Sequence, residues 1–397
     1  MKIKQLFIQF AYNKQRTYMK VEQCLYPNGG KWTTIRGGDV GPAKYQLVHA
    51  FGSTHLLSDP AIFNHIRDRY PNAQVVINST AGEIIDTQVN DDSIALTAIY
   101  FEKTAIATAC INVAAVSGSF EAGVVLAGKI DHAGLVNVLV ISDGQMVNGS
   151  DLVSGLQQSF PPGTIITGGL AGDGSRFERT LVGLNEQPGE GNIVLVGFYG
   201  NDLRVTYGSV GGWDAFGPER LITRSENNVL YELDGKPALE IYKMYLGDYA
   251  TELPGSGLLF PLSIRTAGAS HSIVRTILGV NEDERSLTFA GNMPRGEYAQ
   301  LMRANFDRLI DGASHAAAAS AQGAEQMPDL AILISCVGRK LVLDQRIEEE
   351  IEVVRAIYGD KTAITGFYSY GEISPSFNFM KCELHNQTMT ITTFTEL

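Results

Sequence analysis

The sequence predicts an α/β protein of two domains, in which helices pack on mixed β-sheets built from repeated βαβ units and antiparallel meanders. Its β-branched runs alternate with segments of helical periodicity, which is typical of βαβ units. A strand–helix–strand segment of about 30 residues occurs three times, which indicates an internal repeat. The chain has 397 residues, more than the roughly 150 expected of one domain.

The N-terminal segment leads into the first βαβ unit. We expect a strand over residues 3–10 and then an irregular, glycine-rich segment up to residue 44. The pair Asp59-Pro60 is typical of the first turn of a helix, because the missing proline N–H is not needed there. The first unit accordingly consists of a strand at 45–52, a helix at 60–70 and a strand that ends at Gly82-Glu83.

The second βαβ unit lies between two antiparallel pieces. The runs at 93–101 and 104–113 are separated by two residues only, which predicts a hairpin. A helix at 120–131 precedes the second unit, which has a strand at 136–144, a helix at 149–159 and a strand that ends at Gly172-Asp173. Later runs separated by Gly, Asn and Asp predict an antiparallel meander over 180–184, 192–199 and 203–207.

A domain boundary is expected near residue 230, where a Gly-Lys-Pro turn precedes a helix at 238–246. Residues 1–44 then form an extension with the first strand, 45–230 the first domain and 231–397 the second. The third unit has a strand in the run 330–340, a helix at 345–358 and a strand into 368–372. The other expected elements are strands at 257–264, 273–280, 286–289 and 388–394 and a helix at 306–319.

Polar residues and glycines gather where the strands of the three units end. The carboxyl ends of strands in open α/β sheets line ligand crevices, so these residues are candidates for a ligand site. They are Glu83, Asp143, Gly172, Asp173, Ser335, Cys336, Tyr368, Tyr370 and Glu372. We expect Glu83, Asp173 and Glu372 to accept from a cationic or amino group, with the two tyrosines as walls. The alternative is that the Gly-acid pairs only build turns.

Composition limits the partners. The chain has 43 Asp and Glu against 31 Lys and Arg, a net charge of −12, which argues against binding of nucleic acid. Its four cysteines form no CxxC pair, which argues against a zinc site or a redox pair and favours reduced thiols. No stretch approaches the roughly 20 apolar residues of a membrane span, so we expect no membrane insertion and a cytoplasmic location.

Three other chemistries have partial support. Residues 123–129 match the start of a phosphate-binding GxxxxGK[ST] loop, but Ile130 stands where that loop needs Ser or Thr. Cys336 precedes Arg339 and Lys340, cations that would favour a thiolate, so a thiol-dependent hydrolase is an alternative. Haem held non-covalently is another, and its candidate iron ligands are His49, His271 and His385.

Five phrases of the sequence resemble the FIST family, in the family's order and from about residue 45 to the end. They lie at residues 79–84, 168–180, 229–238, 366–373 and 382–388. The resemblance implies a FIST N-terminal domain over 45–230 and a FIST C-terminal domain over 231–397. FIST domains are regarded as sensory modules of signal transduction that bind small ligands such as amino acids.

The resemblance also bears on partners and cofactors. Some stand-alone bacterial members are described as haem proteins that sense nitric oxide and regulate a histidine kinase. It therefore implies sensing rather than catalysis, with a histidine kinase or another output protein as partner, because the sequence shows no output domain of its own. Haem is the cofactor that the nitric oxide alternative requires; the resemblance makes no cofactor certain.

Overall fold

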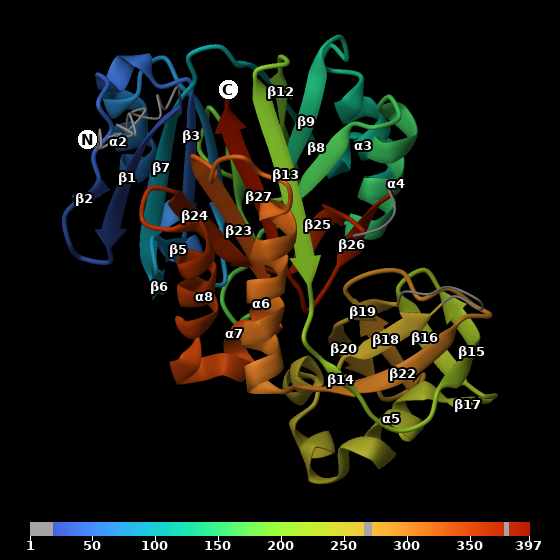
Figure 1. Cartoon of the computed structure of the whole chain (residues 1–397). Coiled ribbons are helices and arrows are strands. Elements are labelled where there is room, and N and C mark those ends of the chain that lie inside the picture. The colour runs from blue at the N-terminus through green and yellow to red at the C-terminus, as the bar shows by residue number, and fades with distance from the viewer. Residues whose placement is uncertain (1–18, 266–271, 377–380) are drawn as a thin grey trace, which may run out of the picture.

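The computed structural model describes residues 19–265, 272–376 and 381–397. It shows a large layered body and a smaller β-rich body (Figure 1). The small body, residues 214–303, is inserted between strand β13 (Leu203–Val210) and helix α6 (Phe306–Ala321) of the large body. The strand predicted over residues 3–10 lies outside the described residues.

Within the described residues, the large body contains three six-stranded sheets. The first has the order β11 (Val182–Leu184), β4 (Gln74–Ser79), β3 (Leu47–Gly52), β7 (Ser93–Tyr100), β1 (Lys20–Pro27) and β2 (Thr33–Arg36). The second has the order β26 (Cys382–His385), β25 (Gly371–Pro375), β10 (Ile165–Leu170), β9 (Leu135–Ser142), β12 (Asn192–Tyr199) and β8 (Ala105–Asn112). The third has the order β13, β27 (Met389–Glu396), β23 (Leu330–Cys336), β24 (Ala363–Ser369), β5 (Glu83–Ile85) and β6 (Gln88–Asn90).

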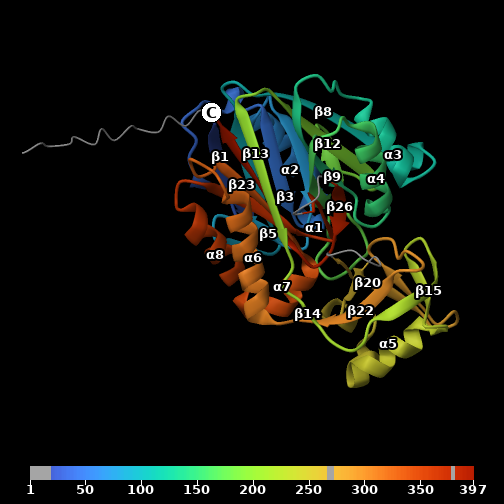
Figure 2. The same ribbon diagram turned by 45° about the vertical axis from the view of Figure 1, so that its right-hand side comes forward.

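The inner faces of the three sheets meet in one apolar core, and helices cover their outer faces (Figures 1 and 2). Phe51 of the first sheet, Ile141 of the second and Phe367 of the third belong to this central cluster. The covering helices are α1 (Thr54–Leu57) and α2 (Pro60–Arg69) on the first sheet, α3 (Ser119–Ala127) and α4 (Gly149–Ser159) on the second, and α6 and α8 (Glu349–Tyr358) on the third.

The three predicted βαβ units are confirmed. In each unit two strands pair in parallel around a covering helix: β3 with β4, β9 with β10, and β23 with β24. The segment that resembles a phosphate-binding loop forms helix α3 instead. A Cβ added at Gly123 would lie 2.5 Å from the Leu152 carbonyl oxygen, so this glycine serves the close packing of α3 against α4.

The predicted hairpin at 93–113 is wrong. Its first strand, β7, pairs with β1 and β3 of the first sheet, whereas β8 pairs with β12 of the second. The carboxylate of Glu396 accepts hydrogen bonds from the backbone N–H groups of Glu102, Lys103 and Thr104 at 2.7–2.8 Å. The short link between β7 and β8 therefore connects the first sheet to the second.

The predicted meander over 180–207 is wrong for the same reason. β11, β12 and β13 follow one another in the chain, but each belongs to a different sheet. Turn residues between strands fix where the chain reverses, not which partner each strand takes. Here each strand is placed by its contribution to the core that the three sheets share.

Residues 19–44 contain regular strands where the sequence predicts an irregular segment. They include β1, which pairs with β7 along eight residues, and β2 at the edge of the first sheet. β1 carries Glu22 and Gln23 at positions that are buried by neighbouring elements, so its pattern does not alternate cleanly in the sequence.

The small body is built on antiparallel strands that pack against helix α5 (Ala238–Leu246). The boundary predicted near residue 230 falls within the hairpin of β15 (Arg220–Glu226) and β16 (Val229–Leu233). Both strands belong to the small body, so the large and small bodies do not separate at that residue. Its remaining strands are β14 (Asp214–Ala215), β17 (Lys236–Pro237), β18 (Leu262–Arg265), β19 (Ile273–Arg275), β20 (Ile277–Asn281), β21 (Ser286–Phe289) and β22 (Tyr298–Arg303).

Candidate functional site

A cavity of about 460 Å³ opens where the carboxyl ends of all three βαβ units meet. Ser53 and Thr80 follow the two strands of the first unit, Gly174 lies in the loop after the second, and Val337 follows the first strand of the third. We call it the rim cavity. Its full lining is Ser53, Thr80, Ala81, Gly82, Glu83, Val89, Asp91, Asp92, Gly174, Ser175, Arg176, Val337, Lys340, Leu341, Asp344 and Ile347.

A helix that the sequence did not predict forms one wall of the rim cavity. Helix α7 (Val337–Leu343) begins directly after β23, and the helix predicted from residue 345 begins at Glu349. Val337, Lys340, Leu341 and Asp344 stand at positions i, i+3, i+4 and i+7, on one helical face, and all line the cavity. That spacing is the signal that could have revealed α7; the short length of the helix hid it.

Glu83 forms the buried floor of the rim cavity. Its side chain accepts hydrogen bonds from the hydroxyls of Thr80 at 2.5 Å and Ser93 at 2.7 Å. Burial raises the pKa of the Glu83 carboxyl from 4.5 to about 7, although these hydroxyls and the charge of Lys340 act in the opposite direction. Glu83 therefore changes its charge near neutral pH.

Both signs of charge line the walls. Lys340 donates from Nζ to the Ala81 carbonyl oxygen at 2.8 Å and pairs with Asp91. A Cβ at Gly82 would lie 2.6 Å from Lys340 Nζ, and its φ of +140° favours glycine, so Gly82 makes room for this lysine. Arg176 is half exposed, and its Nε lies 3.9 Å from the Asp173 carboxylate.

Asp173 and Tyr370 build the loop beside the rim cavity. Asp173 accepts from the backbone N–H groups of Phe177, Glu178 and Arg179, each at 2.9 Å, and from the Tyr370 hydroxyl. It also lines a neighbouring cavity of about 310 Å³, which shares Arg176 with the rim cavity. The contacts of Asp173 are those of a residue that closes a turn.

Asp143 and Gly172 also serve the backbone. Asp143 accepts from the N–H groups of Gln145 at 2.8 Å, Met146 at 2.7 Å and Gly191 at 3.0 Å. A Cβ at Gly172 would lie 2.9 Å from the Ala81 nitrogen, so this glycine allows two strand ends to approach closely. Neither residue lines the rim cavity.

Ser335 and Tyr368 lie behind α7 in a buried network that sequence analysis missed. Both donate to the Glu350 carboxylate, Ser335 at 3.2 Å and Tyr368 at 2.6 Å. Glu350 also forms an ion pair with Arg339 at 2.8 Å, and both side chains are 0% exposed. Removal of either charge would leave the other buried without its partner, which costs about 3–5 kcal/mol.

Glu372 lies in another buried network and not at the rim cavity. It accepts from the hydroxyls of Ser369 at 2.7 Å and Thr388 at 2.9 Å. Burial raises the pKa of the Glu372 carboxyl to about 8. Of the nine predicted residues, the structure thus places Glu83 on the rim cavity and Asp173 beside it, and it does not bring the nine to one surface.

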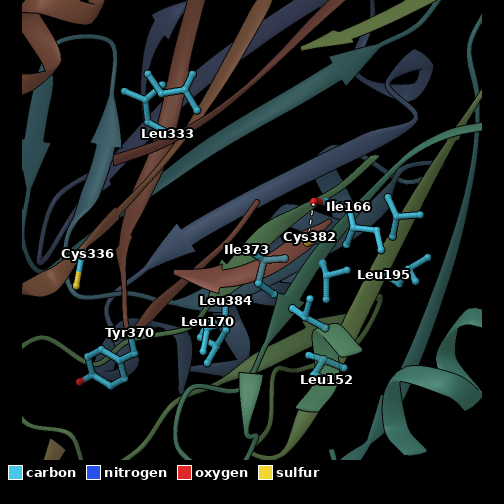
Figure 3. Packing of buried hydrophobic residues seen from close by; sticks show 14 of the residues in the cluster. Leu152, Ile166, Leu170, Leu195, Leu333, Cys336, Tyr370, Ile373, Cys382 and Leu384 are labelled. Atoms are coloured by element: carbon cyan, nitrogen blue, oxygen red, sulfur yellow. Dashed lines mark hydrogen bonds between the residues drawn. The ribbon is translucent and has the colours of Figure 1, made fainter. Parts of the chain in front are cut away.

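Cys336 belongs to a core cluster of apolar residues. Figure 3 labels it with other members of this cluster, including Leu333, Tyr370 and Ile373. Its side chain is fully buried, and burial raises the pKa of its thiol well above the usual range. This environment is the opposite of the exposed, electropositive surroundings that activate a thiol.

The described candidate haem ligands do not fit a haem. His49 is fully buried and its ring stacks on Phe51, so an iron atom bound to it would have to lie within the packed core. Burial lowers its pKa to about 4. His385 Nε2 lies 3.1 Å from the Ser374 carbonyl oxygen, so this nitrogen is engaged within the protein. His271 lies outside the described residues.

Two further absences concern the described residues alone. Within the ranges 19–265, 272–376 and 381–397, no group of three or more His, Cys, Asp or Glu side chains is arranged to hold a metal ion. In the same ranges, no helix is both long and apolar enough to cross a membrane.

Sequence comparison identifies the family. The profile of the FIST N domain matches residues 46–236, and that of the FIST C domain matches residues 238–375. A search of curated proteins found no match. FIST domains are sensory domains of signal transduction that bind small ligands. The two matches cover most of the chain and confirm the resemblance seen in its five phrases, so the chain belongs to the FIST family.

Proposed function

We propose that this protein senses a small zwitterionic ligand, an amino acid, in the rim cavity and passes the signal to a separate protein. The observation that carries this proposal is the convergence of the carboxyl ends of three βαβ units on one cavity with charges of both signs. Ligands of open α/β sheets bind at such ends. Its volume of about 460 Å³ lies in the range of small-molecule sites.

The charges of the rim cavity suit the two ends of an amino acid. Arg176 is half exposed and can donate to a carboxylate with the planar geometry that guanidinium groups offer. Asp92 and Asp344 are exposed on the other elements of the lining and can accept from an ammonium group. These aspartates take the place of Asp173 and Glu372, whose oxygens accept from the protein itself.

The proposal is tested by a thermal-shift screen of the twenty amino acids, followed by calorimetric titration of those that raise the melting temperature. A ligand that binds only the folded state stabilises it by mass action. We expect Arg176→Gln to weaken binding by about tenfold or more, because a charge-assisted hydrogen bond is lost.

Arg179→Gln is the matched control. Arg179 is as exposed as Arg176 and also pairs with an acidic residue, Glu190, but it does not line the rim cavity. We expect this variant to bind as the parent does. The proposal fails if none of the twenty amino acids binds, or if Arg176→Gln binds as tightly as Arg179→Gln.

The other predicted functions draw no support from the described residues. The burial of Cys336 favours a role without catalysis over a thiol-dependent hydrolase. The surroundings of His49 and His385 do not favour the haem-based nitric oxide sensor. A sharp Soret band after reconstitution with haem, shifted by nitric oxide, would revive that alternative. The cytoplasmic location and the histidine kinase partner stay predictions.

A further inference from the structure

Helix α7 contacts the rim cavity on one side and the small body on the other. We propose that α7 couples the two, so that a ligand in the rim cavity changes the packing of the small body against the large one. This inference rests on the proposed function for the identity of the site, and adds the path by which binding reaches another part of the molecule.

One side of α7 is held at the rim cavity. Lys340 and Leu341 line the cavity, and Asp344 ends the helix there. Lys340 reaches across the cavity wall to the Ala81 carbonyl oxygen and to Asp91. A ligand that contacts these side chains would therefore act directly on the position of α7.

The other side of α7 packs where the chain enters and leaves the small body. Val342 and Leu343 form an apolar cluster with Trp213, Met302 and Leu309. Trp213 immediately precedes the small body, and Met302 belongs to its strand β22. Figure 2 shows α7 beside the segments that connect the two bodies.

The polar contacts of Arg339 hold α7 to the segment that enters the small body and to helix α6, which follows the small body in the chain. Its guanidinium donates to the carbonyl oxygens of Gly211 at 2.8 Å, before the small body, and of Leu309 at 2.7 Å, after it. Arg339 also pairs with Glu350, and its side chain is 0% exposed. Loss of its contacts to the two carbonyl oxygens would therefore disrupt the buried hydrogen-bond network that includes the ion pair.

Gly338 links α7 to the small body by a third route. A Cβ added at Gly338 would lie 2.4 Å from the side-chain nitrogen of Gln387, so the helix backbone rests directly on that side chain. Gln387 in turn donates to Thr276 Oγ1 at 3.0 Å and to the Leu258 carbonyl oxygen at 3.2 Å, both in the small body. Closely packed groups of this kind move together.

Trp213 offers a reporter at this interface. Its indole N–H donates to the Gln387 carbonyl oxygen at 3.0 Å, and its ring lies in the cluster with Val342 and Leu343. The only other tryptophan of the sequence, Trp32, lies between β1 and β2 and stacks on His65. Trp32→Phe therefore leaves a single tryptophan that reports on the contact between α7 and the small body.

The first experiment perturbs the cavity side of α7 without any ligand. In the Trp32→Phe background, we expect Lys340→Met to shift the emission of Trp213 and to increase deuterium exchange in residues 255–264 of the small body. Lys129→Met is the matched control, because Lys129 also donates to a backbone carbonyl oxygen, that of Cys110, far from α7. We expect the control to leave both signals unchanged.

Leu341→Ser provides a second variant should Lys340→Met fold poorly, because Leu341 lines the cavity yet is 42% exposed. The coupling is overturned if a folded variant on the cavity side leaves both Trp213 emission and exchange in residues 255–264 as they are in the parent.

The second experiment adds the amino acid that the thermal-shift screen selects, and measures its affinity for Val342→Ala. Coupling between two sites is reciprocal, so a change on the small-body side of α7 should alter affinity, by about fivefold. Affinity equal to the parent's overturns the coupling and leaves the proposed function standing. If no amino acid binds but the cavity-side variants move Trp213, the proposed function fails and the coupling stands.

Discussion

Protonation of Glu83 should change the charge of the rim cavity near neutral pH. The pKa of Glu83 is raised from 4.5 to about 7 by burial. The folded state thus holds this proton more tightly than the unfolded chain, so its contribution to stability is fully present below about pH 4.5 and is lost as the pH rises through 7. The loss is on the order of 3 kcal/mol at most.

We therefore expect Glu83→Gln to flatten the fall in the free energy of unfolding between pH 5 and pH 8, measured by urea denaturation at each pH. Glu240→Gln, a change at an exposed glutamate, should keep the slope of the parent. A Glu83→Gln protein with the parent's slope would show that Glu83 does not titrate in this range.

The cysteines provide a second test at the scale of single residues. Cys110 is half buried, whereas Cys24, Cys336 and Cys382 are buried. We expect a mild alkylating reagent to modify Cys110 first in the folded protein and to leave Cys336 unmodified, as mapped by mass spectrometry of peptides. Modification of Cys336 as fast as Cys110 would restore the hydrolase alternative.

Single residues were the hardest part of the site to predict. Glu83 was predicted and lines the cavity, because a Gly-acid pair after a strand does mark the strand's end. The same pattern predicted Asp173 and Glu372 as ligand-binding residues. Their carboxylate oxygens instead accept hydrogen bonds from N–H and O–H groups of the protein itself. The sequence shows that an acid follows a strand, but whether its oxygens face the backbone or a cavity depends on contacts from distant segments.

Among the elements, the buried ion pair between α7 and α8 is open to a direct test. Arg339 and Glu350 are both 0% exposed. We expect Glu350→Gln to lower the free energy of unfolding by about 3–5 kcal/mol, because Arg339 is left buried without its partner. Urea denaturation measures this change.

The neighbouring glutamate serves as the control. Glu349 pairs with Arg346 at 2.8 Å, but both side chains are more than 40% exposed. Glu349→Gln should therefore cost less than about 1 kcal/mol. If the two variants lost the same free energy of unfolding, the buried Arg339–Glu350 pair would be no more important for stability than the exposed pair.

The elements themselves were predicted well where they were local. α4 has the predicted bounds, and the three units pair as expected, because periodicity and turn residues lie within a few positions of one another. The pairing partners of β7 and β8 were not predictable from the sequence. Two strands joined by a short link have the same sequence pattern whether they pair with each other or belong to separate sheets. α7 was too short to show a periodic pattern.

At the scale of the molecule, the chain repeatedly crosses between three sheets. The third sheet joins β5 and β13, which precede the small body in the chain, to β23, β24 and β27, which follow it. The two family matches meet at residue 237, inside the small body, so neither match coincides with a separate body. Such an arrangement rests on long-range contacts, which a single sequence does not reveal.

This architecture also explains why one cavity collects residues from so much of the chain. In each βαβ unit the carboxyl ends of the strands lie at one edge of the sheet. The core that the three sheets share brings these three edges together. The internal repeat of the sequence thus corresponds to a site built from three parts.

The measurement that tests this account most directly is deuterium exchange of the parent protein with and without the amino acid that gives the largest thermal shift. We predict protection in three of the segments that line the rim cavity, one from each unit: residues 80–92, 174–176 and 337–347. Protection confined to any other part of the chain, with these three segments unchanged, would contradict the claim that the three units form one ligand site.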